Sequence, residues 1–350
     1  MSTPLSALDV PQTDPTPIFE LFRGSYGTEL LTAAVAHLGV FRHFLAGPIT
    51  EADLRSRLRL EDRPATVLLT ALKAFGLIVE AGFGRLDVSE TAREHLLPGA
   101  AFAVGDYLGL AADSPGVLAL VERLRSNRPA AARPDEGAAF IYREGMDSAM
   151  EQEAAARRLT LALAGRARNV APAVARNLSL DGARTLLDVG GGTGIYAIAC
   201  VQKNPGLRAV VWDRPEVLKV AAEMAVSYGV AERVTCLPGD MFADPVPAAD
   251  VVLMSNILHD WDMPQCRALI SRCAAVLPAG GRLVVHDVFL NDALDGPLPI
   301  ALYSAALFTL TEGRAYSATE YSTWLQEAGL IPGEVVPTLI HCGLLAGVKS

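Results

Sequence analysis

Short apolar runs separated by polar and glycine-rich segments recur through the second half of the chain. Five of these runs have lengths that suit buried strands. They cover residues 185–187, 207–212, 234–237, 250–255 and 281–285. An apolar pattern with helical spacing begins at Ile195, after the glycine-rich segment that follows the first run, and predicts a strand, a turn and a helix. We therefore expect an α/β fold with an open sheet in this half of the chain.

Helical patterns dominate the first half. Between Ile18 and Phe44, apolar residues recur at helical spacing and are more numerous than one buried helix face requires. The surplus favours a surface that a second copy of the chain covers. An ordinary helical layer within one chain would leave the same pattern, so both interpretations stay open. Residues 1–17 contain four prolines among Ser, Thr and Asp, and we expect a flexible arm there.

Residues 49–88 predict a winged helix, which consists of two helices and a hairpin. Thr50 is the expected N-cap of the first helix, with Asp53 at the capping-box position, and the second helix follows Pro64. Glycines between the runs 77–80 and 85–88 predict the hairpin. From residue 47 to residue 100 there are seven Lys or Arg and eight Asp or Glu, which is not the charge balance of a DNA-binding surface. A role in dimerisation is the better interpretation.

Composition narrows the classes of protein. The chain has 350 residues, 51% of them hydrophobic, which is enough for two domains with large cores. A net charge of −9 argues against nucleic acid as a partner. The five cysteines form no Cys-x-x-Cys pair, which favours a reducing, cytoplasmic location. No signal segment or membrane span is evident in the sequence.

A glycine-rich segment follows the first strand of the second half. After Asp188, four of the next six residues are glycine, and Gly190, Gly192 and Gly194 alternate with other residues. Such a loop suits a nucleotide-like ligand, because glycine accepts positive φ and lets a ligand approach the backbone. A dinucleotide fingerprint would need a glycine at position 195, where this chain has Ile195. A plain tight turn is the alternative interpretation.

Polar residues follow each of the later strands. Asp213 ends the second strand, where nucleotide-binding folds place an acceptor for ribose hydroxyls. The sequence Gly239-Asp240-Met241-Phe242 follows the third and offers a carboxylate for an amine and apolar bulk for a purine. His259 follows the fourth strand, and the fifth is expected to end at His286 and Asp287. These residues converge on one crevice at the carboxyl ends of the strands.

The succession Asp-Val-Gly-Gly-Gly-Thr-Gly, Trp-Asp-Arg-Pro, Gly-Asp-Met-Phe and Ile-Leu-His-Asp-Trp resembles the plant-type small-molecule O-methyltransferases and their bacterial relatives, over nearly the whole chain. The resemblance implies a Rossmann-like class I methyltransferase domain with an N-terminal all-α, winged-helix dimerisation domain. It also implies a homodimer, S-adenosyl-L-methionine (SAM) as cofactor and S-adenosyl-L-homocysteine as product. The implied cofactor-binding residues are Asp188, Gly190, Gly192, Asp213, Arg214, Gly239, Asp240, Met241, Phe242 and Ser255.

Methyl transfer to a phenolic oxygen needs a base, and His259 is the candidate because an imidazole titrates near neutral pH. The resemblance assigns Asp287 the task of orienting this imidazole, and we expect Asp260 and Trp261 to cap and pack the following helix. A metal site at the two His-Asp pairs is a weaker alternative, because residues 286 and 287 of a regular strand point to opposite faces.

This chain departs from the plant pattern at two positions. Ser255 stands where the plant enzymes have a cofactor-site lysine, and Ala315 stands where they have a second catalytic glutamate. We expect Asp287 to orient His259 alone, with Glu312 outside the site.

The substrate pocket is the least defined part of the prediction. Our candidates are Tyr142, Met146, Phe308 and Leu310, although Tyr142 and Met146 also suit a core helix face. The predicted parts of the chain are the arm (1–17), the winged-helix dimerisation domain (18–110), a helical connector contributing to the substrate pocket (111–178) and the SAM-binding domain (179–350).

The leading function is a SAM-dependent O-methyltransferase of secondary metabolism that acts on a small aromatic or polyketide-like acceptor. Two alternatives stay open. One is a methyltransferase fold that binds SAM but catalyses a decarboxylation, hydroxylation or pericyclic step, and the other is a winged-helix regulator. Whether O, N or C accepts the methyl group is also open.

Overall fold

The computed structural model describes residues 4–128 and 153–350, and these residues form two compact units. The first, here called the sheet unit, contains residues 4–19, 153–289 and 318–350. The second, the helical unit, contains residues 20–128 and 290–317.

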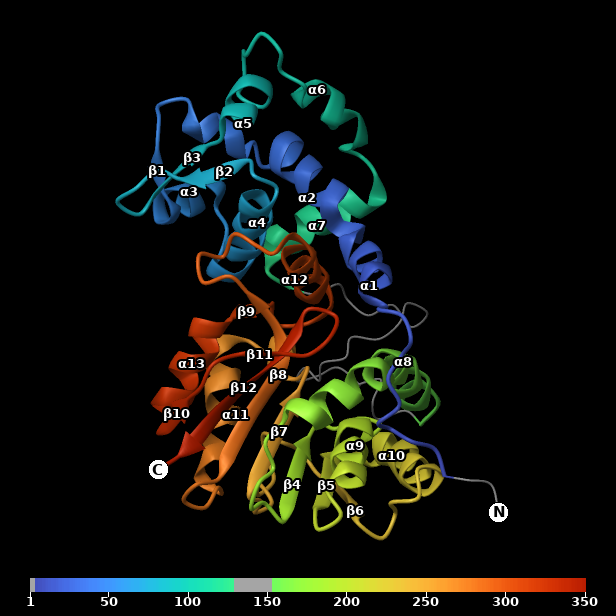
Figure 1. Cartoon of the computed structure of the whole chain (residues 1–350). Helices are drawn as coiled ribbons and strands as arrows, with labels where there is room; N and C mark the ends of the chain where they lie inside the picture. Colours follow the sequence, from blue (N-terminus) through green and yellow to red (C-terminus); the bar gives the residue numbers. More distant parts are fainter. Residues whose placement is uncertain (1–3, 129–152) are drawn as a thin grey trace. The chain divides into compact units, whose positions relative to one another are not determined.

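A mixed sheet forms the centre of the sheet unit (Figure 1). Along the sheet, its strands are β10 (Leu330–Pro332), β12 (Cys342–Lys349), β8 (Arg282–Leu290), β7 (Val251–Ser255), β4 (Thr185–Val189), β5 (Arg208–Asp213) and β6 (Val234–Pro238). The five strands from β8 to β6 are parallel, whereas β12 is antiparallel to β8 and to β10. A short strand, β11 (Val336–Pro337), pairs with β12.

Helices cover both faces of this sheet, as a largely parallel sheet requires. Figure 1 shows one group on each side of the strands. One group consists of α8 (Glu153–Asn177), α9 (Ile195–Lys203) and α10 (Pro215–Ser227), and the other consists of α11 (Met263–Ala275) and α13 (Ala318–Glu327). The first four residues of β7, from Val251 to Met254, are all buried. This burial on both faces explains the uninterrupted apolar sequence of the strand.

The order of the strands creates the crevice that the sequence predicted. From β4 the chain moves outward to β5 and β6, and it then returns to β7 on the other side of β4. The connections after β4 and β7 therefore leave in opposite directions, and ligands of open α/β sheets bind at such a switch point. The glycine-rich loop follows β4, and a short 3₁₀ turn, η6 (Leu258–Asp260), follows β7.

Strand β8 is longer than the sequence predicted. We expected it to end at His286 and Asp287, but it continues to Leu290, and both polar residues lie inside it. Polar side chains usually mark strand ends, but here both are buried, and each has a partner: Ser255 of β7 for His286, and His259 of the turn after β7 for Asp287. Because His286 pairs with Ser255, the two residues still lie level with the end of β7.

The helical unit contains the predicted winged helix. Its parts are α3 (Glu51–Leu58), α4 (Asp62–Ala74) and a small sheet in the order β1 (Ile49–Thr50), β3 (Arg85–Val88) and β2 (Ile78–Glu80). Eight of the 13 residues of α4 are buried, including the whole run from Val67 to Leu72. A helix buried to this extent has little free surface for a DNA groove.

Short helices make up most of the remaining helical unit. They are α1 (Thr16–Arg23), which begins in the sheet unit, η1 (Gly24–Tyr26), α2 (Gly27–Thr32), η2 (Ala33–His37), η3 (Val40–Phe44), α5 (Glu90–His95), α6 (Gly105–Leu108), η4 (Gly109–Ala111) and α7 (Pro115–Ser126). Helix α12 (Leu298–Leu310) and the short strand β9 (Tyr316–Ser317) complete the unit.

Three details differ from the sequence prediction. Thr50 caps α3, but the Asp53 carboxylate accepts from the Thr50 hydroxyl at 2.7 Å, because Asp is one methylene shorter than the Glu of a full capping box. Residues 290–317 belong to the helical unit, where the apolar helix α12 packs against α4. The supposedly flexible arm is held at residues 5–7, since Gln202 accepts from the Ala7 amide at 2.7 Å and donates to the Leu5 carbonyl at 2.9 Å.

No helix among the described residues combines enough length with enough apolar character to cross a membrane.

Candidate active site

The glycine-rich loop has the backbone geometry that its sequence predicted. Gly190, Gly192 and Gly194 have φ of 61°, 58° and 69°, a region that side-chain-bearing residues rarely adopt. A Cβ at Gly190 would lie 2.5 Å from Ile257, and one at Gly194 would lie 2.9 Å from Val211. A Cβ at Gly192 would have no atom within 4 Å. The loop is therefore packed at its two ends and open at Gly192.

Asp213 lies at the end of β5, beside this opening. Its carboxylate accepts hydrogen bonds from the backbone amides of Gly192 at 2.8 Å and Arg214 at 2.7 Å, one to each oxygen. Each carboxylate oxygen has a second lone pair, so Asp213 retains acceptor capacity for a ligand hydroxyl. Burial raises the pKa of Asp213, although the two amides act against it.

Asp188 lies in β4 beneath the loop and is fully buried. Neither of its carboxylate oxygens has a well-formed hydrogen-bond partner among the described residues. Burial, and after it the charge of Asp213, raise the pKa of Asp188 to about 7, against a small opposing effect of the Ala197 amide. A buried acid of this kind is a signal of a functional site.

The segment after β6, from Gly239 to Phe242, contributes polar and aromatic side chains. The Asp240 carboxylate accepts a hydrogen bond from the Phe242 backbone amide and forms an ion pair with Arg214 at 3.1 Å. The ring of Phe242 meets that of Trp261 edge to face, with centroids 4.6 Å apart. A side chain at Gly239 would collide with the indole of Trp212, so this position requires glycine. The Met241 carbonyl accepts from Arg272.

His259 and Asp287 form the central contact of the site. Nδ1 of His259 lies 2.6 Å from Oδ1 of Asp287, and both side chains are buried. Burial alone would raise the pKa of Asp287, but His259 and the Val288 amide outweigh it and lower this pKa, so Asp287 is a carboxylate. The proton of the neutral imidazole therefore lies on Nδ1, and Nε2 is left as an acceptor.

A second carboxylate lies near the other imidazole nitrogen. Oδ1 of Asp260 is 3.6 Å from Nε2 of His259. Burial opposes the charged imidazole, but Asp287 and Asp260 outweigh burial and raise the pKa of His259 above its usual value. The expected helix cap at Asp260 is wrong. Asp262 caps α11, because its carboxylate accepts from the Gln265 amide and lies two residues closer to the first helical turn.

His286 and Asp287 point to opposite faces of β8, as strand geometry predicts. Nδ1 of His286 lies 2.7 Å from the Ser255 hydroxyl, and Nε2 lies 3.2 Å from that of Thr338. Burial lowers the pKa of His286 to about 3, which keeps this imidazole neutral. Ser255 is thus part of a polar network with His286.

Tyr321 belongs to the site but is not part of any sequence motif. Its hydroxyl donates to Oδ2 of Asp287 at 3.1 Å, from helix α13. A tyrosine in an ordinary amphipathic helix has no motif that would mark it. Asn256 was also missed, although it directly follows β7 and precedes His259. Its φ of 57° is unusual for a residue with a side chain.

The substrate candidates have different surroundings. Tyr142 and Met146 lie outside the described residues. Phe308 is fully buried in the core of the helical unit, with the Arg63 guanidinium 4.6 Å from its ring centroid. Leu310 lies near the end of α12 and is 41% exposed. Their contact with an acceptor stays a prediction.

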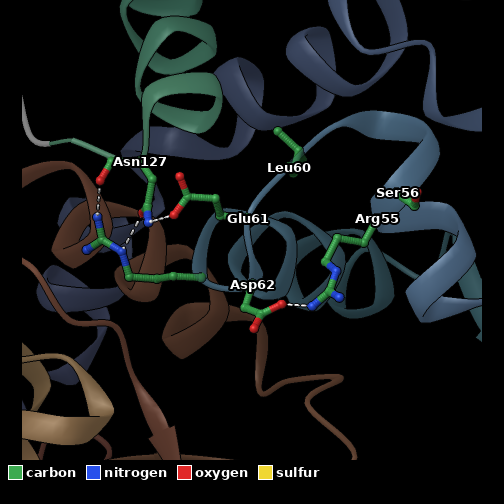
Figure 2. A pocket seen from close by; sticks show the side chains of 7 residues that line it. Arg55, Ser56, Leu60, Glu61, Asp62 and Asn127 are labelled. Atoms are coloured by element: carbon green, nitrogen blue, oxygen red, sulfur yellow. Dashed lines mark hydrogen bonds and ion pairs between the residues drawn. The ribbon is translucent and has the colours of Figure 1, made fainter.

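A surface hollow of about 550 Å³ lies in the helical unit (Figure 2). Its lining consists of Arg55, Ser56, Leu60, Glu61, Asp62, Arg63 and Asn127. The charged groups there face one another, since Arg55 pairs with Asp62 and the Asn127 amide donates to Glu61. Arg63 also holds the Thr311 and Gly313 carbonyls. These contacts give the polar residues of the hollow a structural role.

The α/β sheet with its antiparallel strand, the glycine loop at the switch point and the acids after the next two strands define a class I methyltransferase. The O-methyltransferase domain model matches residues 132–331. The chain belongs to this O-methyltransferase family, and the family's methyl donor is SAM. Both agree with the sequence prediction.

Full-length relatives support this assignment. The chain is 35% identical over 341 residues to the 3-hydroxy-5-methyl-1-naphthoate 3-O-methyltransferase of Streptomyces sahachiroi, with 96% of each chain covered. It is 30% identical over 318 residues to the tetracenomycin polyketide synthesis 8-O-methyl transferase of Streptomyces glaucescens, covering 90% of this chain and 91% of the relative. An O-methyltransferase family 2 protein from Planctomyces limnophilus, solved in complex with apigenin, is 47% identical with a TM-score of 0.90, and the match covers 100% of both chains.

Proposed function

We propose that this protein transfers a methyl group from SAM to a hydroxyl of a small aromatic or polyketide-like molecule, with His259 as the general base. The observation that carries the proposal is the buried contact of 2.6 Å between His259 and Asp287. It gives the imidazole a fixed orientation and leaves Nε2 as the atom that accepts a proton. Family membership supports the reaction class.

The residues around the glycine loop fit a nucleoside cofactor. The open side of Gly192 leaves room beside the backbone, and Asp213 has acceptor capacity for ribose hydroxyls. Asp240 offers a carboxylate for an exocyclic amine, and Met241 and Phe242 offer apolar surface for a purine. Bound SAM supplies a methyl group on a positively charged sulfonium. We infer that Asp188, Arg214, Gly239 and Ser255 also belong to the cofactor site.

The proposed task of His259 is to remove the acceptor's proton. A phenol has a pKa of about 10, so it needs a base to become a strong nucleophile at neutral pH. Nε2 of His259 takes the proton, and the positive charge that forms on the imidazole is stabilised by Asp287 on Nδ1 and by Asp260 near Nε2. The rest of the catalytic effect is correct placement of the hydroxyl.

The class of acceptor is inferred from the relatives. Two of them are described as methylating a hydroxynaphthoate and a tetracenomycin polyketide, and a third was solved with apigenin. All three compounds carry hydroxyl groups on aromatic rings. We infer a hydroxylated aromatic acceptor for this chain, with Tyr142, Met146, Phe308 and Leu310 as the candidate contact residues.

The deciding experiment combines methyl-labelled SAM with a panel of apigenin, 3-hydroxy-1-naphthoic acid, a hydroxyindole and a hydroxyquinone. Label in the organic extract, lost in the His259→Gln variant, is the expected result. SAM binding by calorimetry without any label transfer would instead favour a non-methylating reaction. Turnover that persists in His259→Gln would reject His259 as the base.

We further infer that the protein is a homodimer in the cytoplasm. Large apolar side chains such as Phe22 and Leu110 are exposed in the helical unit, which favours a partner copy as their cover. All five cysteines are free thiols, which suits a reducing compartment. Light scattering tests the first inference and cell fractionation tests the second.

A further inference from the structure

A side chain from α8 reaches the segment that carries His259. Nη2 of Arg166 donates to Oδ1 of Asn256 at 2.7 Å and to Sγ of Cys342 at 2.9 Å. Asn256 is the first residue after β7 and precedes His259 by three positions. Arg166 thus contacts the connection between the strand and the proposed base.

Asn256 forms a corner in this connection. Its φ of 57° is a left-handed conformation, which most side-chain-bearing residues avoid and Asn tolerates better than most. Three contacts hold the corner in place. The Asn256 amide donates to the His286 carbonyl at 2.8 Å, its side-chain nitrogen donates to the Ser255 hydroxyl at 3.0 Å, and its side-chain oxygen accepts from Arg166. The direction in which the chain leaves β7 depends on this corner.

Charges from three elements act on His259 among the described residues. Asp287 belongs to β8, Asp260 to η6 and Arg166 to α8. The two carboxylates favour the charged imidazole, which has no free nitrogen with which to accept a proton. The guanidinium acts in the opposite sense, since a like charge disfavours the imidazolium. Burial of the imidazole is the largest effect in this direction, and the charge of Arg166 adds to it.

We propose that Arg166 is a positioning residue for His259, which fixes the Asn256 corner and supplies a permanent positive charge that favours the neutral imidazole. The role rests on the function proposed above for His259. Arginine suits both tasks, because its guanidinium stays charged at physiological pH and presents its donors in one rigid plane.

The test is an NMR titration of the histidine side chains in the full-length protein, which requires neither SAM nor an acceptor. The His259 signal is identified among the six histidines by its absence from His259→Gln. Arg166→Gln should raise the His259 titration midpoint by about half a pH unit to one unit. Arg166→Lys, which keeps the charge, should stay close to the unaltered protein.

Two other variants serve as controls. Arg168→Gln removes a charge from the same helix at an exposed position and should leave the midpoint unchanged. Asp260→Asn removes a negative charge and should lower the midpoint.

Asn256→Asp tests the electrostatic role if Arg166→Gln does not fold. Asp tolerates the same left-handed backbone conformation, and its negative charge offsets that of the guanidinium. The His259 titration midpoint should therefore rise in this variant as well. An unchanged midpoint in every folded Arg166→Gln or Asn256→Asp protein overturns the proposal. A raised midpoint together with normal turnover in His259→Gln would leave the electrostatic role intact and reject His259 as the base.

Discussion

The Tyr321 hydroxyl donates a 3.1 Å hydrogen bond to Oδ2 of Asp287, the carboxylate whose other oxygen contacts His259. The tyrosine belongs to α13 and the aspartate to β8. Both oxygens of a buried carboxylate are therefore engaged, one by an imidazole and one by a phenol. We expected Asp287 to hold the imidazole alone, and the structure adds Tyr321 as a support for it.

Replacing Tyr321 with Phe should reduce methyl transfer moderately. A hydrogen bond to a charged group contributes about 1.5 to 3 kcal/mol, and part of it should be lost from the orientation of Asp287, which corresponds to a decrease of roughly 3- to 30-fold. Single-turnover methylation at saturating SAM measures the effect. Tyr228→Phe, at a buried tyrosine in the core of the sheet unit, is the matched control. Equal rates for the two variants would show that Tyr321 has no special role.

Loss of the base or of its carboxylate should be more severe. His259→Ala should lower turnover by about 100-fold to 10,000-fold, and Asp287→Ala by a comparable factor, because the imidazole loses both its orientation and its preferred tautomer. Glu312→Ala should have a mild effect. Single-turnover rates for the three variants give the comparison. A Glu312→Ala protein as slow as His259→Ala would assign Glu312 the role of the glutamate that Ala315 lacks.

Much of the fold was predictable because local patterns determine it. The apolar runs of β4 to β7, the glycine loop and the winged helix each depend on residues that are close in sequence. The sequence also indicated His259 and Asp287 as candidates. His259 is a polar residue shortly after an apolar run, and Asp287 is a polar residue that interrupts one.

The rest depends on packing between distant segments. Nothing in the sequence of α12 indicates that it packs against α4, more than 200 residues earlier, because an apolar helix suits any core. Tyr321 and Arg166 have ordinary helical surroundings in the sequence, and only the tertiary fold brings them to Asp287 and Asn256. The extension of β8 to Leu290 was not predicted, because the polar residues His286 and Asp287 suggested that the strand ends there.

The pH dependence of turnover should report the charge of His259. Its pKa is raised above the usual value of about 6.5, and only the neutral imidazole accepts a proton, so kcat/KM should fall as pH decreases through a midpoint above about 6.5. Burial raises the pKa of Asp260 to about 6, so this carboxylate is mostly charged at pH 7. Asp260→Asn should therefore move the acidic limb to lower pH. A limb that stays fixed, or that moves to higher pH, contradicts the assignment.

Asp213 should account for a large part of cofactor affinity. Its remaining acceptor capacity is the proposed partner of the ribose hydroxyls, and hydrogen bonds to a charged group contribute about 1.5 to 3 kcal/mol. Asp213→Ala should then weaken SAM binding roughly 10- to 100-fold in a calorimetric titration. Asp181→Ala removes an exposed carboxylate from the same unit and should bind normally. Unchanged affinity in a folded Asp213→Ala protein would reject the ribose assignment.

The helical unit exposes large apolar side chains that water solvates poorly. Leu21, Phe22, Tyr107 and Leu110 are 82%, 78%, 75% and 81% exposed in one copy of the chain. Fully covering such a side chain is worth about 1.5 to 3 kcal/mol, so a few of them can stabilise a dimer. We expect the purified protein to have twice the mass of one chain by light scattering, and the double variant Phe22→Glu with Leu110→Glu to have the mass of a single chain. Val226→Glu changes another exposed apolar residue, on α10 of the sheet unit, and should keep the double mass. A monomeric unaltered protein, or a double variant that remains dimeric, would place the dimer contact elsewhere or remove it.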